Sequence, residues 1–336
     1  MHMNHRLAAL SAVAIFAAAL VSGCGAPATT GSPANTGSAQ DVSGNDKIQV
    51  VASFYPMADF AQKIGGNRVE VKNLVPAGVE PHEWEPSPKD ITSIEKSDVF
   101  VYNGADMEGW VDDALASVDT SKTQVVEASK GIELRSADHS HDADGAEAET
   151  HEGQDEHDHV GEHDPHVWLS PKNAKKELEN IRDGLVKADP GHKVDYEKNY
   201  DRYTKEFETL DREYAEGLAT ATSKTIVVSH EAYGYLCDEF GLTQLPITGM
   251  DAEGEPDAKT MAQIVDFVKK NNIKTIFSEN LVSPKVAQQI ADEAGAECVQ
   301  LNPVEGLTDE QLTAGEDYLS VMRDNLDKLV AALNEK

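Results

Sequence analysis

The sequence predicts an α/β protein with two lobes, each built from four strand–helix units around a parallel sheet. Short runs rich in Val and Ile alternate with helical segments along two stretches of the chain, and this alternation is typical of parallel sheets covered by helices. The 336 residues are enough for two separate cores. Between the two stretches lies one long apolar stripe of helical period, which predicts a helix that joins the lobes.

The first α/β series is expected over residues 47–188. Its apolar runs predict buried strands at 48–54, 69–75, 99–102 and 123–127. Helical segments follow them at 55–64, 89–96, 110–116 and 172–188. Gly65-Gly66 is a typical helix end, and Ser170-Pro171 is a typical helix start.

The linking helix is expected within residues 189–221. Its stripe has residues spaced by three or four positions: Tyr196, Tyr200, Tyr203, Phe207, Leu210, Tyr214 and Leu218. A straight helix over 191–218 would be about 42 Å long. A coiled coil is the alternative, but a single aromatic stripe flanked by α/β segments favours a rigid strut. The aromatic residues are interpreted as core packing.

The second α/β series is expected over residues 222–336. Its strands are predicted at 225–229, 242–247, 273–277 and 297–301, and its helices at 231–240, 257–270, 284–294 and 313–333. Cys237 and Cys298 lie in this series. They could form a disulfide in an oxidising compartment or remain two buried thiols, and the sequence leaves both open.

The N-terminus has the pattern of an export signal over residues 1–23. The apolar run from Leu7 to Leu20 is too short for a stable membrane span. Val21-Ser22-Gly23-Cys24 then resembles a bacterial lipobox, with Cys24 as the lipidation site; the alternative is an ordinary signal peptide with a coincidental cysteine. Residues 24–46, rich in Gly, Ala, Ser and Thr, predict a flexible tether. We therefore expect an extracytoplasmic domain that is lipid-anchored to the cell membrane.

The charge of the chain limits its partners. A formal net charge of −31 argues against binding to nucleic acid or to an anionic membrane surface, and it permits a cationic ligand. A well-solvated acidic surface would explain the same charge. We expect a monomer.

A histidine-rich run precedes the second half of the chain. The 28 residues from His139 to His166 include seven His and ten Asp or Glu, and no Lys or Arg. Such a segment cannot form a core, but neutral imidazoles bind zinc, copper and nickel. A solvated acidic loop is the alternative. Auxiliary metal capture is assigned to the histidines before the end of the run: His139, His141, His151, His157, His159 and His163.

Four candidate metal ligands follow strands or proline-fixed turns: His82, His166, His230 and Glu305. In a parallel sheet, ligands bind beyond the carboxyl ends of the strands, so these side chains would converge if the two sheet edges face each other. Three imidazoles and one carboxylate form a tetrahedral set suited to zinc.

Glu279 also ends a predicted strand. It is the alternative fourth ligand, or a partner that fixes the tautomer of a ligand imidazole. Pro303 would stiffen the turn before Glu305 and favours Glu305 as the ligand. His192 lies at the start of the linking helix and is excluded.

Five motifs, together with the signal, lipobox and tether, carry a resemblance to a known family. They are Ser53-Phe54-Tyr55-Pro56, Pro81-His82-Glu83-Trp84-Glu85, Asp164-Pro165-His166-Val167-Trp168-Leu169-Ser170-Pro171, Ser229-His230-Glu231-Ala232-Tyr233-Gly234-Tyr235-Leu236 and Leu301-Asn302-Pro303-Val304-Glu305-Gly306-Leu307. In these the chain resembles the zinc-type solute-binding lipoproteins of bacterial ABC importers, the ZnuA- and AdcA-like members of the metal-binding cluster A-I family.

The resemblance implies two (β/α)4 lobes joined by one long helix, with the metal site between them and a histidine-rich loop of variable length. It places the ligands at His82, His166, His230 and Glu305, although some zinc-type members complete the site with water. Manganese- and iron-type relatives carry carboxylates at the last two positions, so His230 favours zinc. The resemblance also implies delivery of Zn²⁺ to a membrane permease of an ABC transporter.

Two other functions are compatible with this set of residues. One is manganese or iron binding by the same fold, and another is a zinc hydrolase. His230-Glu231-Ala232-Tyr233-Gly234 has Gly where a zincin motif needs its second His, so the sequence does not indicate an enzyme. An adhesin function would be compatible with surface display as a secondary role.

Overall fold

The computed structural model describes residues 47–137 and 161–335. Residues 45–336 form one compact unit that contains both predicted series. The predicted signal, Cys24, the whole predicted tether and the histidines from His139 to His159 lie outside the described residues. Within the described ranges, no helix is both long and apolar enough to cross a membrane.

The N-terminal sheet contains four parallel strands in the order β2-β1-β3-β4. They are β1 (Ile48–Ala52), β2 (Val69–Asn73), β3 (Val99–Tyr102) and β4 (Gln124–Glu127). In the register, Val50 of β1 lies beside Val71 of β2 and Val99 of β3. Runs of Val fit this position because the central strands of a parallel sheet are buried on both faces.

The helices of this series are α1 (Tyr55–Gly65), α2 (Pro88–Glu95), α3 (Val111–Leu115) and α4 (Pro171–Ala188). The Ser170 hydroxyl accepts a hydrogen bond from the Asn173 backbone N–H, which is the capping contact that Ser170-Pro171 predicts. Gly184 lets α4 lie close to β4, because a Cβ there would be 2.2 Å from Val126 Cγ2.

The C-terminal sheet repeats the same topology. Its parallel strands have the order β6-β5-β7-β8, with β5 (Thr225–Val228), β6 (Thr243–Pro246), β7 (Thr275–Ser278) and β8 (Glu297–Gln300). The helices between them are α6 (Gly234–Phe240), α7 (Ala258–Lys270) and α8 (Lys285–Ala294). The predicted fold class, with two four-stranded parallel sheets and covering helices, is confirmed.

Two predicted helices differ from the observed ones by more than two residues at one end. The single closing helix over 313–333 is wrong: α9 (Asp309–Ala314) ends at Gly315, which has φ 80°, and α10 (Tyr318–Leu333) begins after Asp317. The Asp317 carboxylate caps α10 by accepting from the Ser320 backbone N–H. Helix α6 begins at Gly234, because the residues before it form the turn that carries His230. Cys237 and Cys298 are free thiols.

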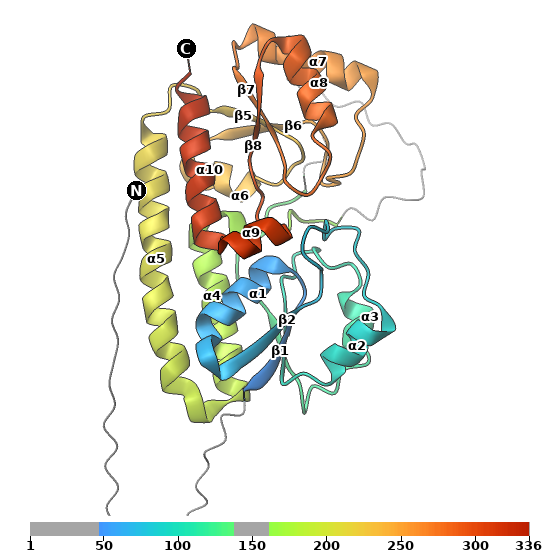
Figure 1. The fold of residues 1–336 in the computed structure, drawn as a ribbon, viewed down its shortest axis with the longest axis vertical. Coiled ribbons are helices and arrows are strands. Elements are labelled where there is room, and N and C mark those ends of the chain that lie inside the picture. Colours follow the sequence, from blue (N-terminus) through green and yellow to red (C-terminus); the bar gives the residue numbers. More distant parts are fainter. Residues whose placement is uncertain (1–46, 138–160, 336) are drawn as a thin grey trace, which may run out of the picture. The chain divides into compact units, whose positions relative to one another are not determined.

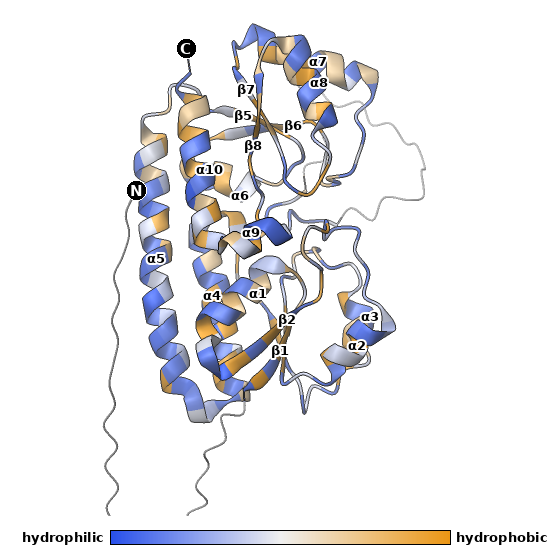
Figure 2. Cartoon of the chain, viewed as in Figure 1, coloured by the Kyte–Doolittle hydropathy of each residue, from blue (hydrophilic) through white to orange (hydrophobic). Residues whose placement is uncertain are grey.

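The long helix α5 (Lys193–Ala219) has 27 residues and is therefore about 40 Å long. It packs against α1, α4 and α10 (Figure 1). Figure 2 shows both hydrophilic and hydrophobic residues along this helix. Most of the stripe is buried, and Tyr200 and Tyr203 pack at its margin.

One hydrophobic core connects the two series through α5. Phe207 of α5 contacts both Phe60 of α1 and Tyr318 of α10, with ring centroids 5.6 Å and 5.1 Å apart. Phe60 and Tyr318 also touch each other directly, at 4.9 Å. The same core includes Val50 and Val101 of the N-terminal sheet and strand residues of the C-terminal sheet. The helix is therefore part of a shared core, and this packing resists bending between the two sheets.

Candidate metal centre

Four side chains from the carboxyl ends of the two sheets meet at one point. His82 follows β2, His166 follows β4, His230 follows β5 and Glu305 follows β8. All strands of each sheet are parallel, so their carboxyl ends share one edge, and ligands of α/β sheets bind beyond this edge. The topology explains why residues so far apart in sequence converge.

The four donor atoms have the spacing of a tetrahedral metal site. His166 Nε2 lies 3.2 Å from both His82 Nε2 and His230 Nε2. Glu305 Oε1 lies 3.2 Å from His166 Nε2, 3.2 Å from His230 Nε2 and 3.5 Å from His82 Nε2. Donors placed tetrahedrally around zinc at ordinary bond lengths would be roughly 3.3 Å apart. The arrangement can therefore hold a zinc ion with little movement of the side chains.

Glu305 Oε1 is buried and, among the described residues, has no hydrogen bond of proper geometry. A buried carboxylate oxygen without a partner is costly, so its position beside three imidazoles fits a cation better than a hydrogen-bond network. Burial alone would raise the pKa of Glu305, but the neighbouring imidazoles, His230 foremost, hold it well below its ordinary range. The carboxylate is thus poised in its charged form.

Three of the four side chains are almost fully buried. The side chains of His166, His230 and Glu305 are at most 1% exposed, whereas that of His82 is 14% exposed. A buried set of donors excludes water and strengthens electrostatic attraction to a cation. His82 is the one of these four side chains that solvent reaches.

Asp164 holds His166 in place. One carboxylate oxygen of Asp164 lies 2.9 Å from His166 Nδ1 and accepts from the His166 backbone N–H at 3.0 Å. The Tyr235 hydroxyl donates to the Asp164 carbonyl, and the Asn103 amide donates to the Pro165 carbonyl. Burial alone would lower the pKa of His166, but Asp164 and Glu305 raise it. A carboxylate on Nδ1 leaves Nε2 free to bind metal.

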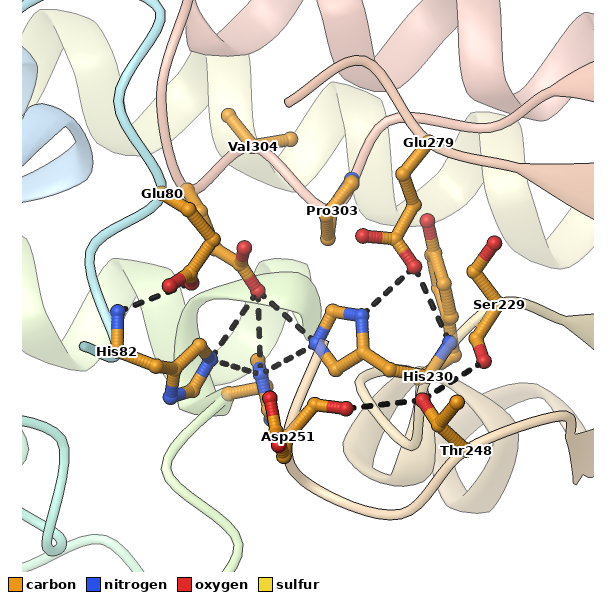
Figure 3. A network of polar contacts seen from close by, with 12 residues as sticks. Glu80, His82, Ser229, His230, Thr248, Asp251, Glu279, Pro303 and Val304 are labelled. Carbon is orange, nitrogen blue, oxygen red and sulfur yellow. Dashed lines mark hydrogen bonds and ion pairs between the residues drawn. The ribbon is translucent and has the colours of Figure 1, made fainter. Parts of the chain in front are cut away.

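Glu279 has the equivalent role for His230 (Figure 3). It contacts both Nδ1 and the backbone N–H of His230, as Figure 3 shows. Burial alone would lower the pKa of His230, but the charges of Glu279 and Glu305 raise it well above its ordinary value. Glu279, at the end of its strand, therefore holds the His230 imidazole with Nε2 turned toward the other three donors.

Glu80 orders the loop that carries His82 (Figure 3). Its carboxylate accepts from the backbone N–H of His82 at 2.9 Å and of Glu83 at 3.2 Å. Burial raises the pKa of Glu80, although His82 partly opposes this shift. Sequence reasoning did not identify Glu80 or Asp164, although each lies two residues before a candidate ligand, and this repeated spacing was a usable signal.

The remaining predicted residues lie elsewhere. His163 contacts Asp106, with its Nδ1 2.9 Å from the carboxylate, and is not part of the four-residue cluster. His192 contacts Asp189 near the start of α5, in agreement with its exclusion. His139, His141, His151, His157, His159 and Cys24 lie outside the described residues.

Comparisons with known proteins agree with this geometry. Residues 50–332 match the family model described as zinc-uptake complex component A, periplasmic (ZnuA). The high-affinity zinc uptake system protein ZnuA of Bacillus subtilis is 41% identical over 316 residues, which cover 94% of each chain. The zinc-binding lipoprotein AdcA of Streptococcus pneumoniae strain R6 is 39% identical over 289 residues, or 84% of this chain and 55% of AdcA.

A solved structure extends the comparison to the fold. The Zn(II)-bound ZnuA-like domain of Streptococcus pneumoniae AdcA superimposes with a TM-score of 0.73 at 37% sequence identity, and the match covers 86% of this chain and all of that one. The family match spans both sheets, α5 and all four converging residues. The chain therefore belongs to the family of periplasmic zinc-uptake component A proteins, the ZnuA family.

Proposed function

We propose that this protein captures Zn²⁺ outside the cytoplasm and delivers it to the permease of an ABC transporter. The observation that carries the proposal is the set of three imidazole nitrogens and one carboxylate oxygen, all within 4.8 Å of one another. We assign His82, His166, His230 and Glu305 as the ligands. Zinc is the cargo of this site, and three neutral imidazoles with one carboxylate match its preference.

The composition of the site supports zinc over manganese or iron. Imidazole suits zinc, whereas manganese favours carboxylates and water. Three of the four donors here are imidazoles, and His230 occupies a position where a carboxylate would favour manganese. The buried carboxylates Asp164 and Glu279 lie on the Nδ1 side of their imidazoles and so do not compete for the metal.

The same geometry supports transport over hydrolysis. A catalytic zinc keeps an open coordination position for water, whereas four protein donors complete a tetrahedral shell. Glu305 occupies the position that a reactive water would need. A closed shell suits binding and transfer.

Membrane attachment is proposed from the sequence. Lipidation at Cys24 and the tether over residues 24–46 would hold a monomeric binding domain near the permease. The histidine-rich run would collect additional ions with lower affinity. The histidine-rich run and the buried site around His166 would then have separate roles.

The experiment is metal analysis and chelator competition on the soluble chain from Gly25 onward. The wild type should retain one tightly bound Zn²⁺, and His82→Ala should bind it much more weakly. His192→Ala is the matched control, because this imidazole contacts Asp189 away from the site. A wild type without tight zinc binding, or equal losses in both variants, would refute the proposal.

A further inference from the structure

We propose that Trp168 is a positioning residue that aims Glu305 at the metal by holding the turn of residues 302–305. The inference rests on the proposed zinc-binding function and extends it. Trp168 does not touch the metal position. Its role is to connect the segment that carries His166 with the segment that carries Glu305, so that the fourth donor is placed only when the two segments are in contact.

The backbone before Glu305 is in an unfavourable conformation. Val304 has φ 59°, in the left-handed region, where a β-branched residue is rare. Its side chain is fully buried. A strained conformation of this kind persists only where surrounding contacts impose it, and such residues gather at ligand sites. The contacts of the turn therefore decide where the Glu305 carboxylate points.

Three hydrogen bonds hold the turn from within the second α/β series. The Asn302 side-chain oxygen accepts from the Val304 backbone N–H at 2.7 Å. Asn325 of α10 accepts from the Asn302 N–H at 3.0 Å and donates to the Asn302 carbonyl at 2.6 Å. These bonds fix the start of the turn, and they leave the carbonyl of Pro303 to be satisfied from elsewhere.

Trp168 supplies that contact from the first series. Its indole Nε1–H donates to the Pro303 carbonyl at 2.8 Å, and both groups are buried. If this bond were lost, a donor and an acceptor would both remain buried without a partner, which makes the contact strongly favoured. The Trp168 indole thus secures the residue directly before the strained Val304.

The same indole packs against a ligand. Trp168 lies in the short helix η2 (Val167–Leu169), two residues after His166, and the two ring centroids are 5.3 Å apart. The Tyr318 hydroxyl, at the start of α10, donates to the Trp168 carbonyl at 2.5 Å. One residue therefore contacts His166 on one side and the Glu305 turn on the other. A shift of either segment would change the geometry of both donors.

The test is a double-mutant cycle between Trp168→Phe and Glu305→Gln, read as zinc affinity by chelator competition. Phenylalanine keeps an aromatic ring but removes the Nε1–H. We expect Trp168→Phe to weaken zinc binding roughly 10-fold, as for other groups that orient metal ligands. In the Glu305→Gln background the same substitution should change affinity by no more than about 2-fold, because the phenylalanine ring still packs against His166 and the lost Nε1–H acts through Glu305.

Two further measurements separate positioning from a general structural effect. With Co²⁺ in place of zinc, the visible spectrum of Trp168→Phe should shift toward that of Glu305→Gln. Tyr196→Phe is the control, because it also keeps an aromatic ring and removes one donor; its hydroxyl donates to Asp189 near the start of α5, away from the site, so affinity and spectrum should be unchanged. Unchanged zinc affinity in Trp168→Phe, or an equal loss in both backgrounds, would overturn the inference.

A second variant covers the case in which Trp168→Phe does not fold, as judged by thermal unfolding of the metal-free form. Asn302→Ala removes the acceptor for the Val304 N–H from the other end of the turn. It should weaken zinc binding only when Glu305 is present. Losses independent of Glu305 would contradict the role of the turn. If the wild type binds zinc tightly and the variants do not behave as expected, the inference about Trp168 fails while the proposed function stands.

Discussion

Glu279 contacts His230 on the side of the imidazole ring opposite the metal position. Its carboxylate lies 2.7 Å from His230 Nδ1, whereas His230 Nε2 lies 3.2 Å from the Glu305 carboxylate. Both glutamates follow strands of the same sheet, yet only Glu305 lies beside the three ring nitrogens. We therefore propose different roles for the two carboxylates: Glu279 fixes the tautomer of His230, and Glu305 binds the ion.

This division predicts different losses for the two glutamates. Glu305→Ala should weaken zinc binding without abolishing it, because three imidazoles remain and water can take the fourth position. Glu279→Ala should have the smaller effect, within roughly 10- to 100-fold, as expected for a group that orients a ligand. Chelator competition on both variants measures the order, and a larger loss for Glu279→Ala would contradict it.

Zinc affinity should fall as the pH falls. Nearby carboxylates raise the pKa values of His166 and His230, so these imidazoles take up protons above the ordinary value of about 6.5 in the metal-free protein. Protonated imidazole cannot bind metal, and zinc must displace those protons. The decline should therefore begin above pH 6.5 and continue into the mildly acid range. Competition assays over this range test it; constant affinity would count against a site dominated by histidine.

The histidine-rich run should be dispensable for the tight site. The residues on either side of positions 138–160 are paired. Ser136 and His163 form an antiparallel bridge, and the Ala137 N–H donates to the Glu162 carbonyl. Residues 138–160 can therefore be replaced by a short Gly-Ser linker without separating these ends. The variant should keep one tight zinc and lose weaker additional ions in a titration. Loss of the tight event would show that the site has been assigned to the wrong residues.

Zinc binding should change the overall dimensions very little. Helix α5 packs against elements of both series, and the aromatic contacts of Phe60, Phe207 and Tyr318 join them in one core. A hinge motion that closes the two α/β series on each other would have to break this core. X-ray scattering should give nearly equal radii of gyration for the metal-free and zinc-bound forms, and a large decrease on adding zinc would contradict the rigid connection.

Much of the architecture could be predicted because its signals are local. The alternation of Val-rich runs and helical segments placed the strands of both sheets close to their observed bounds. The stripe on α5 was readable because core packing requires apolar residues at helical spacing. The closing helix was predicted as one element because its apolar pattern continues past Gly315. The break there depends on the left-handed Gly315 and the Asp317 cap.

The details of the site depended on contacts that sequence spacing does not reveal. The four converging residues could be chosen from their positions after strands, but the separate roles of Glu279 and Glu305 need the turn at Val304. A β-branched residue argues against the left-handed conformation that Val304 adopts, so local rules predict the wrong backbone there. The indole bond from Trp168 to Pro303 joins residues 135 positions apart and has no local signal.

The most direct test of the account is a crystal structure of the zinc-loaded protein with anomalous data at the zinc edge. We predict one strong peak in the cluster, about 2 Å from Nε2 of His82, His166 and His230 and from the Glu305 carboxylate. Glu279 should remain on Nδ1 of His230. A peak bound by Glu279 with Glu305 turned away, or a peak outside this cluster, would contradict the assignment.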